Sequence, residues 1–148
     1  MFDKAIRAGR VRFGNGDIYS RHEKALPLIR AIRRGVAFFN LPDMDFGPQE
    51  AVFVPFMGVP AATLLAPSKM ARALAMKVQP VVAEILPGGQ GYRVRFLDPW
   101  TDFPSEDPTA DAARMNEWIA SEVRRNPSQY YWVHKRFKTR PPGEPSLY

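Results

Sequence analysis

Proline is the residue type that most limits how this chain can fold, because it occupies fifteen of the 148 positions. A proline lacks the backbone N–H donor and disfavours the interior of helices and of central strands. We therefore expect short elements joined by many irregular connections. The longest uncharged run, residues 51–68, illustrates the effect. It is interrupted by Pro55, Pro60 and Pro67 and by Gly58, which makes it a poor transmembrane helix.

Hydrophobic periodicity predicts three helices, over residues 24–34, 61–76 and 108–125. The first is expected to end at Gly35, and the second to break or start near Pro67. The third is the best defined. Asp107 is a good N-cap, Pro108 suits the first helical position, and Asn126-Pro127 ends the pattern.

Extended segments are expected at residues 36–41, 51–56, 78–86 and 92–97. The first is apolar enough to be a buried strand, and the last two are predicted to form a hairpin around residues 87–91. In residues 92–97, apolar side chains alternate with Arg93 and Arg95, which predicts a buried apolar face and an exposed basic face. Helices and strands thus alternate, and the fold class is α/β, a mixed sheet flanked by helices.

The net charge of +6 is unevenly distributed. Residues 1–35 hold nine basic and three acidic side chains, and the rest of the chain is balanced. A basic leading segment suits phosphates, an anionic membrane surface or an acidic protein, although a solvated helix face explains it equally well. Cysteine is absent, which excludes disulfides and thiolate metal sites.

Asp43 and Asp45 follow the first apolar segment, in the stretch Asn40-Leu-Pro-Asp-Met-Asp-Phe-Gly-Pro48. Three interpretations remain open. Two carboxylates can hold Mg²⁺ or Mn²⁺, as in metal-dependent glycosyltransferases. They can instead accept backbone N–H groups of the turn. Alternatively, one of them places a basic residue in a cleft at the end of a strand.

Other candidate chemistry is weak. His22 and His134 lie outside any nucleophile pattern, and no Gly-x-Ser-x-Gly occurs. His134 is therefore interpreted as structural or as a surface residue. The basic and aromatic tail, residues 130–148, suits either a single-stranded nucleic acid or lipid phosphates, and composition does not separate the two.

Five stretches carry a resemblance to a known family: LPDMDFGP (41–48), VFVPFMGVPAAT (52–63), GYRVRF (91–96), ARMNEWI (113–119) and QYYWVHKRFKTRPPGEPSLY (129–148). In this order they resemble the C-terminal half of the bacterial lipid A biosynthesis acyltransferases, the lauroyl/myristoyl transferase family. The resemblance implies that residues 1–148 are part of one glycerolipid-acyltransferase-like domain, ending in an extended proline-rich tail over 139–148. It also implies transfer of a fatty acyl group from acyl carrier protein to a hydroxyl of a lipid A precursor.

The resemblance further implies a place on the cytoplasmic face of the bacterial inner membrane, on its anionic surface, with no cofactor, no metal and no nucleic acid. In this family the base is a histidine in an H-x4-D/E motif, which this sequence lacks. No catalytic residue is therefore assigned. The motif and the family's membrane anchor are expected upstream of Met1, so the chain alone is expected to be inactive.

By resemblance, Arg21, Asp43 and Asp45 are assigned to the substrate side of the cleft. Asp43 is expected to fix the Arg21 guanidinium, although a purely structural pair is the alternative, and Asp45 is expected to bond backbone amides of its own turn. Phosphate or carrier contacts are assigned to Lys135, Arg136, Lys138 and Arg140. The competing hypotheses are a metal-dependent glycosyltransferase fragment using Asp43 and Asp45, and a non-enzymatic basic module that binds anionic lipid or RNA.

Overall fold

The computed structural model describes residues 2–14, 16–19 and 24–148, which form two compact units. The first unit, Met1–Phe38, contains helix α1 (Phe2–Val11) and helix α2 (Ala25–Arg33). Helix α2 confirms the helix predicted at 24–34, and Gly35 follows it with a φ of 86°, the left-handed conformation of a helix stop. No helix in the described part of the chain is long and apolar enough to cross a membrane.

The predicted strand at 36–41 is wrong. These residues form no strand, and Val36, Phe39 and Leu41 are 50%, 75% and 50% exposed. The segment is apolar, but an extended segment becomes a strand only when a neighbour takes its backbone hydrogen bonds. None of the described strands pairs with it.

The second unit, Phe39–Tyr148, holds all the strands of the described chain. Its elements are β1 (Ala51–Phe56), β2 (Val59–Leu64), α3 (Ala66–Ala73), β3 (Val81–Ile85), the 3-10 helix η1 (Pro87–Gly89), β4 (Tyr92–Phe96), α4 (Pro108–Arg125) and the 3-10 helix η2 (Pro127–Gln129). Strands β1 and β2 form one antiparallel pair, and β3 and β4 form another. The α/β composition is therefore confirmed, but the strands form two separate hairpins and not one mixed sheet.

The predicted helix at 61–76 is wrong in its first part, because residues 59–64 form β2. The chain reverses after β1 through Met57 and Gly58, whose φ angles are 51° and 83°. Two consecutive residues with positive φ make the tight turn that matches the twist of a hairpin. The chain therefore returns as a strand, and helix α3 begins only at Ala66.

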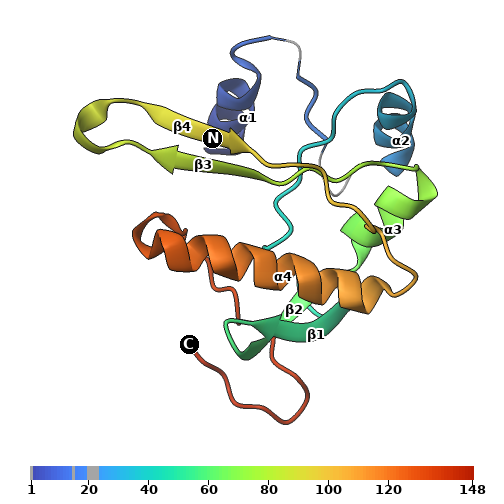
Figure 1. The fold of residues 1–148 in the computed structure, drawn as a ribbon, viewed down its shortest axis with the longest axis vertical. Coiled ribbons are helices and arrows are strands. Elements are labelled where there is room, and N and C mark those ends of the chain that lie inside the picture. Colours follow the sequence, from blue (N-terminus) through green and yellow to red (C-terminus); the bar gives the residue numbers. More distant parts are fainter. Residues whose placement is uncertain (1, 15, 20–23) are drawn as a thin grey trace. The chain divides into compact units, whose positions relative to one another are not determined.

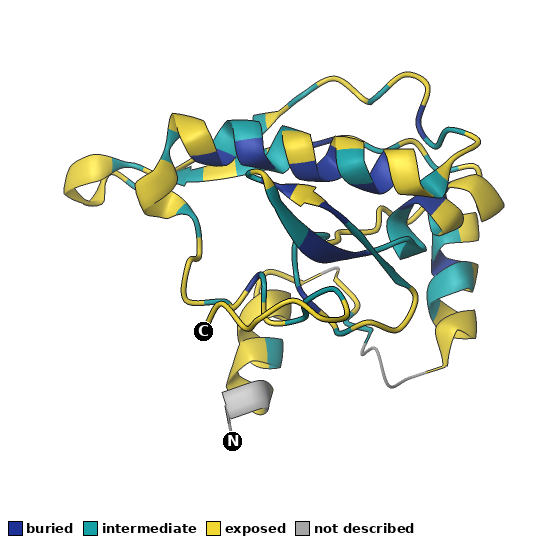
Figure 2. Cartoon of the chain, turned by 90° about the horizontal axis from the view of Figure 1, so that it is seen from below, coloured by how far each residue is buried: buried dark blue, intermediate teal, exposed yellow. Residues whose placement is uncertain are grey.

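Helix α4 contacts both hairpins and forms the centre of this unit (Figure 1). Its N-cap is Asp107, which accepts a hydrogen bond of 2.8 Å from the Thr109 amide, as predicted. Its buried face packs on β1 and β2 in two clusters (Figure 2). One contains Val54, Ala71, Phe103, Ala112 and Met115; the other contains Phe56, Ala61 and Ala120.

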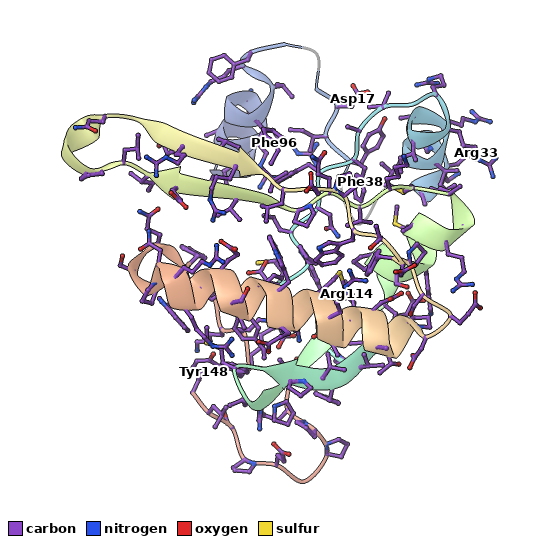
Figure 3. All side chains as sticks on the ribbon, in the orientation of Figure 1. Asp17, Arg33, Phe38, Phe96, Arg114 and Tyr148 are labelled. Atoms are coloured by element: carbon purple, nitrogen blue, oxygen red, sulfur yellow. The ribbon has the colours of Figure 1, made fainter. Side chains whose placement is uncertain are left out.

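The β3–β4 hairpin has the opposite orientation to the one predicted. Its apolar face consists of the cross-strand pairs Val81–Phe96, Ala83–Val94 and Ile85–Tyr92, and all six residues are exposed, Phe96 by 70% (labelled in Figure 3). Its charged face is anchored instead. Arg95 bonds Glu84 at 3.1 Å and Glu122 of α4 at 2.5 Å. The hydrogen bond to Glu122 is the main reason that the pKa of Arg95 is raised.

Candidate functional site

The loop that carries the two aspartates is bound to the C-terminal segment, residues 130–140, through Asp45. This carboxylate is 4% exposed. It accepts hydrogen bonds from the Thr139 amide (2.9 Å), the Thr139 hydroxyl (2.8 Å) and the Gly47 amide (2.9 Å). The bond from Gly47 confirms that Asp45 shapes its own turn. With three donors on its two oxygens, Asp45 is an anchor between two segments that lie 94 positions apart.

Asp43 is the carboxylate of the pair that remains partly exposed. Its charge acts on Tyr130 and His134 of the C-terminal segment. The Tyr130 hydroxyl is buried, and burial followed by the charge of Asp43 raises the pKa of Tyr130. Burial lowers the pKa of His134, and the charge of Asp43 partly offsets that shift. His134 is therefore neutral near pH 7, next to an acidic group.

Arg136 lies in the interior of the site, where it is 2% exposed. Its guanidinium donates to the Ala62 carbonyl (2.7 Å), to the Thr63 hydroxyl (2.9 Å) and to the Asn116 side-chain oxygen (3.2 Å). It also stands over the Phe56 ring, 5.4 Å from the centroid. Burial lowers the pKa of Arg136, and the nearby negative charges of Asp43 and Asp45 act in the opposite direction.

The Thr63 hydroxyl joins this network completely. It accepts from Arg136 and from the Asn116 amide group (2.9 Å), and it donates to the Ala61 carbonyl (3.0 Å). Strand β2, helix α4 and the C-terminal segment are thus connected by buried hydrogen bonds. This network is the polar floor of the site, and within it the Nε atom of Arg136 is buried without a hydrogen-bond partner.

The assignment of Arg136 to a phosphate or carrier contact does not fit the structure. The guanidinium is enclosed and already bonded to three groups. Arg140 is similarly engaged, since it donates to the Pro60 carbonyl at 2.8 Å and pairs with Glu144. Lys135 and Lys138 are exposed, and Lys135 stands over the Tyr148 ring, which is labelled in Figure 3. These two lysines remain available to an anionic partner.

Arg21 and His22 lie outside the described residues, so the predicted Arg21–Asp43 pairing stays a prediction. The metal interpretation loses one of its ligands, because both oxygens of Asp45 are engaged by Thr139 and Gly47. Among the residues that the structure describes, no group of three or more His, Asp or Glu side chains gathers in a way that suits a metal ion.

Sequence reasoning missed Thr63, Asn116 and Tyr130. A signal for Asn116 was present, because it lies four positions from both Ala112 and Ala120, which are fully buried on one face of α4. The helical period therefore places an amide in the core, and a buried amide requires a partner. No comparable signal marks Thr63 or Tyr130.

Comparison with known proteins shows which family the sequence matches. The profile of the family described as bacterial lipid A biosynthesis acyltransferase matches residues 1–139. The chain is 36% identical over 95% of its length to the lipid A biosynthesis lauroyltransferase of Escherichia coli (strain K12), covering 45% of that protein. It is 34% identical over 97% of its length to the lipid A biosynthesis myristoyltransferase of the same strain, covering 44%.

A lipid A biosynthesis acyltransferase of Haemophilus influenzae is 36% identical over the whole chain, which covers 48% of that relative. The chain thus spans about half the length of the curated relatives that it matches. The matched region includes the aspartate loop, both hairpins, helix α4 and almost all of the C-terminal segment. The chain belongs to the bacterial lipid A biosynthesis acyltransferase family.

Proposed function

We propose that this chain supplies the acceptor side of an acyl transfer reaction, in which a fatty acyl group moves from acyl carrier protein to a hydroxyl of a lipid A precursor. Family membership supports the reaction class. The observation that carries the site is the different environment of the two aspartates. Both oxygens of Asp45 are engaged in structural hydrogen bonds, whereas the Asp43 side chain stays partly exposed.

In this proposal Asp43 orients the polar end of the acceptor, directly or through a guanidinium such as that of Arg21. A carboxylate and a guanidinium make strong, directional hydrogen bonds, and Arg suits a phosphorylated acceptor. Transfer to a hydroxyl also needs a base within hydrogen-bond reach, which typically contributes about 10²–10⁴-fold in rate. This role needs a group besides Asp43.

Neither histidine in the sequence has a carboxylate five positions further on. The residue at that distance is Pro27 for His22 and Thr139 for His134. Thr139 is bonded to Asp45, and the Nε2 atom of His134 is buried. We therefore infer that the chain by itself transfers no detectable acyl group, and that the base is supplied by a segment corresponding to the half of the relatives that this chain does not span.

We also propose that the chain works at an anionic surface, the cytoplasmic face of the inner membrane, and that it meets the acidic acyl carrier protein there. Exposed cations are available for this. They include Lys135 and Lys138 in the second unit, and Lys4, Arg10, Arg30, Arg33 and Arg34 in the first. Each basic side chain near such a surface contributes about 1 kcal/mol to binding.

The proposed function is tested by an acyl transfer assay with acyl-acyl carrier protein and a lipid A precursor. The purified chain is expected to show no turnover. A fusion to the part of the E. coli lauroyltransferase that the chain does not match is expected to restore it. In that fusion Asp43→Ala should reduce the rate by about 10²-fold, because misplacing a reactant costs about that much.

The matched control is Asp98→Ala in the same fusion, since Asp98 is an exposed aspartate of the same unit. It should leave the rate unchanged. Full activity of the Asp43→Ala fusion would remove Asp43 from the site. Turnover by the unfused chain that disappears in His134→Ala would instead identify His134 as the base.

A further inference from the structure

Two polar atoms beside Asp43 lack hydrogen-bond partners although they are buried. They are the Tyr130 hydroxyl and the Nε2 atom of His134; the Nε atoms of Arg136 and Arg140 in the same segment are likewise buried without a partner. The two rings are neighbours, with centroids 6.5 Å apart. Leaving a buried donor or acceptor unsatisfied costs about 1–3 kcal/mol. Such groups are rare in native structures, and a pair of them at one place requires an explanation.

The charge of the same carboxylate, Asp43, acts on the Tyr130 phenol and on the His134 imidazole, although neither buried atom has a hydrogen-bond partner. Two residues further along, Asp45 is bonded to Thr139. This anchor keeps the aspartate loop against the C-terminal segment that carries Tyr130 and His134.

The burial of Nε2 argues against a direct catalytic role for His134. A hydroxyl nucleophile cannot reach an atom that is enclosed by protein. The same holds for the enclosed Tyr130 oxygen. Both side chains therefore act on a ligand only through Asp43, the partly exposed member of the group.

We propose that Tyr130 and His134 are positioning residues for Asp43: their O–H and Nε2–H groups are the donors that set the direction of its carboxylate toward the acceptor. This inference rests on the proposed role of Asp43. It requires the neutral imidazole with its proton on Nε2. The charged groups that act on His134 are Asp43, Asp45, Arg136 and Lys138, and the two cations together with burial keep it neutral.

The test is an NMR titration of the His134 ring in the full chain, with the tautomer read from the nitrogen shifts. The chain has two histidines, so His22→Gln assigns the signals. We expect the Nε2–H tautomer and a pKa below the usual value of about 6.5. Asp43→Asn should lower that pKa further, because it removes the negative charge that stabilises imidazolium. Asp43→Glu should largely restore it.

Tyr130→Phe should have the opposite effect. Without the phenol donor, the Asp43 charge acts on the imidazole alone and raises its pKa. The matched control Asp98→Asn should leave the titration unchanged. An identical His134 titration in the wild-type chain and in Asp43→Asn, or an Nδ1–H tautomer, would overturn the proposal. The titration needs no substrate, so its outcome stands independently of the acyl transfer assay.

Discussion

At the scale of single residues, burial decides which of the basic side chains of the C-terminal segment are structural. Lys135 and Arg136 are adjacent in sequence, but their environments differ. Lys135 is exposed, whereas Arg136 is buried and donates hydrogen bonds to residues of β2 and α4. Hydrogen bonds to a charged group contribute about 1.5–3 kcal/mol. Removing the group also leaves its buried partners unsatisfied.

We therefore expect Arg136→Ala to lower the free energy of unfolding by about 3 kcal/mol. Lys135→Ala, the matched control, should change it by less than about 0.5 kcal/mol. Urea denaturation followed by circular dichroism measures both. Equal effects of the two substitutions would show that the Arg136 network contributes nothing to stability.

Protonation of His134 makes the free energy of unfolding depend on pH. Its pKa is lower in the folded chain than in the unfolded chain, so the unfolded state binds more protons between the two values. The associated stability is fully present above about pH 6.5, and it is lost as the pH falls from there to the folded pKa. The difference in unfolding free energy between wild type and His134→Gln should therefore become smaller as the pH falls through this window. A difference that is constant with pH would show that the ring is not buried in its neutral form.

Sequence patterns predicted single residues well only where local rules apply. Asp107 as an N-cap, Gly35 as a helix stop and Asp45 as a turn residue follow from contacts within a few positions, and all three are found. The polar floor could not be predicted, because Arg136 meets Thr63 across 73 positions and Asn116 across 20. Lys135 and Lys138 flank Arg136 in the sequence, and an arginine in such a basic stretch is ordinarily expected at the surface.

At the scale of elements, α3 is fastened to the start of α4 by a buried carboxylate. Asp111 is 2% exposed, and it accepts from the Ser68 hydroxyl at 2.5 Å and from the Ser105 amide at 3.0 Å. The neighbouring pair of Arg72 and Glu106 joins the same regions, but the Glu106 side chain is 95% exposed. These two carboxylates therefore form a matched pair for measurement.

Asp111→Ala should lower the free energy of unfolding by about 2–3 kcal/mol, because the buried Ser68 hydroxyl and the partly buried Ser105 amide lose their acceptor. Glu106→Ala should cost at most about 1 kcal/mol, the range of surface ion pairs. Thermal and chemical denaturation of both variants provides the comparison. If Glu106→Ala is as destabilising as Asp111→Ala, burial is not the deciding factor at this junction.

The β3–β4 hairpin shows why an alternating pattern does not identify the buried face. The period of two correctly separates apolar from charged side chains. On the charged face of the hairpin, Arg95 donates a hydrogen bond to Glu122 of α4. The side-chain amide of Gln129 also bonds the backbone N–H and carbonyl of Ile85. Its apolar face stays exposed, and contiguous exposed apolar surface marks an interaction site.

We expect substitutions on this apolar face to be tolerated. Phe96→Ala should change the free energy of unfolding by less than about 1 kcal/mol, since the ring is 70% exposed. Phe56→Ala should cost about 3–5 kcal/mol, because that ring is fully buried against Tyr130 and Phe137. Denaturation midpoints decide the matter, and a large loss in Phe96→Ala would mean that the hairpin face is covered in solution.

At the scale of the whole molecule, exposed positive charge is a property of both units. The net charge is +6, and residues 1–35 carry nine of the 21 lysines and arginines. In the described part of that segment Lys4, Arg30 and Arg33 are exposed. The class of partner that such a charge distribution favours is anionic, and this could be predicted from composition because exposed charge needs no knowledge of the fold.

We therefore expect the purified chain to bind vesicles that contain anionic lipids, and to bind neutral vesicles weakly. Attraction between exposed charges is screened as salt rises, because the Debye length falls from about 10 Å at 0.1 M to about 3 Å at 1 M. Co-sedimentation across this range should show binding lost at high salt.

Charge reversal at Arg30 and Arg33 should weaken binding, since each cation contributes about 1 kcal/mol near the surface. Charge reversal at Arg93, which is exposed on the β3–β4 hairpin outside the basic leading segment, is the comparison and should weaken binding less. Binding that is indifferent to salt and to lipid charge would show that apolar contacts, and not the basic segment, hold the chain at the membrane.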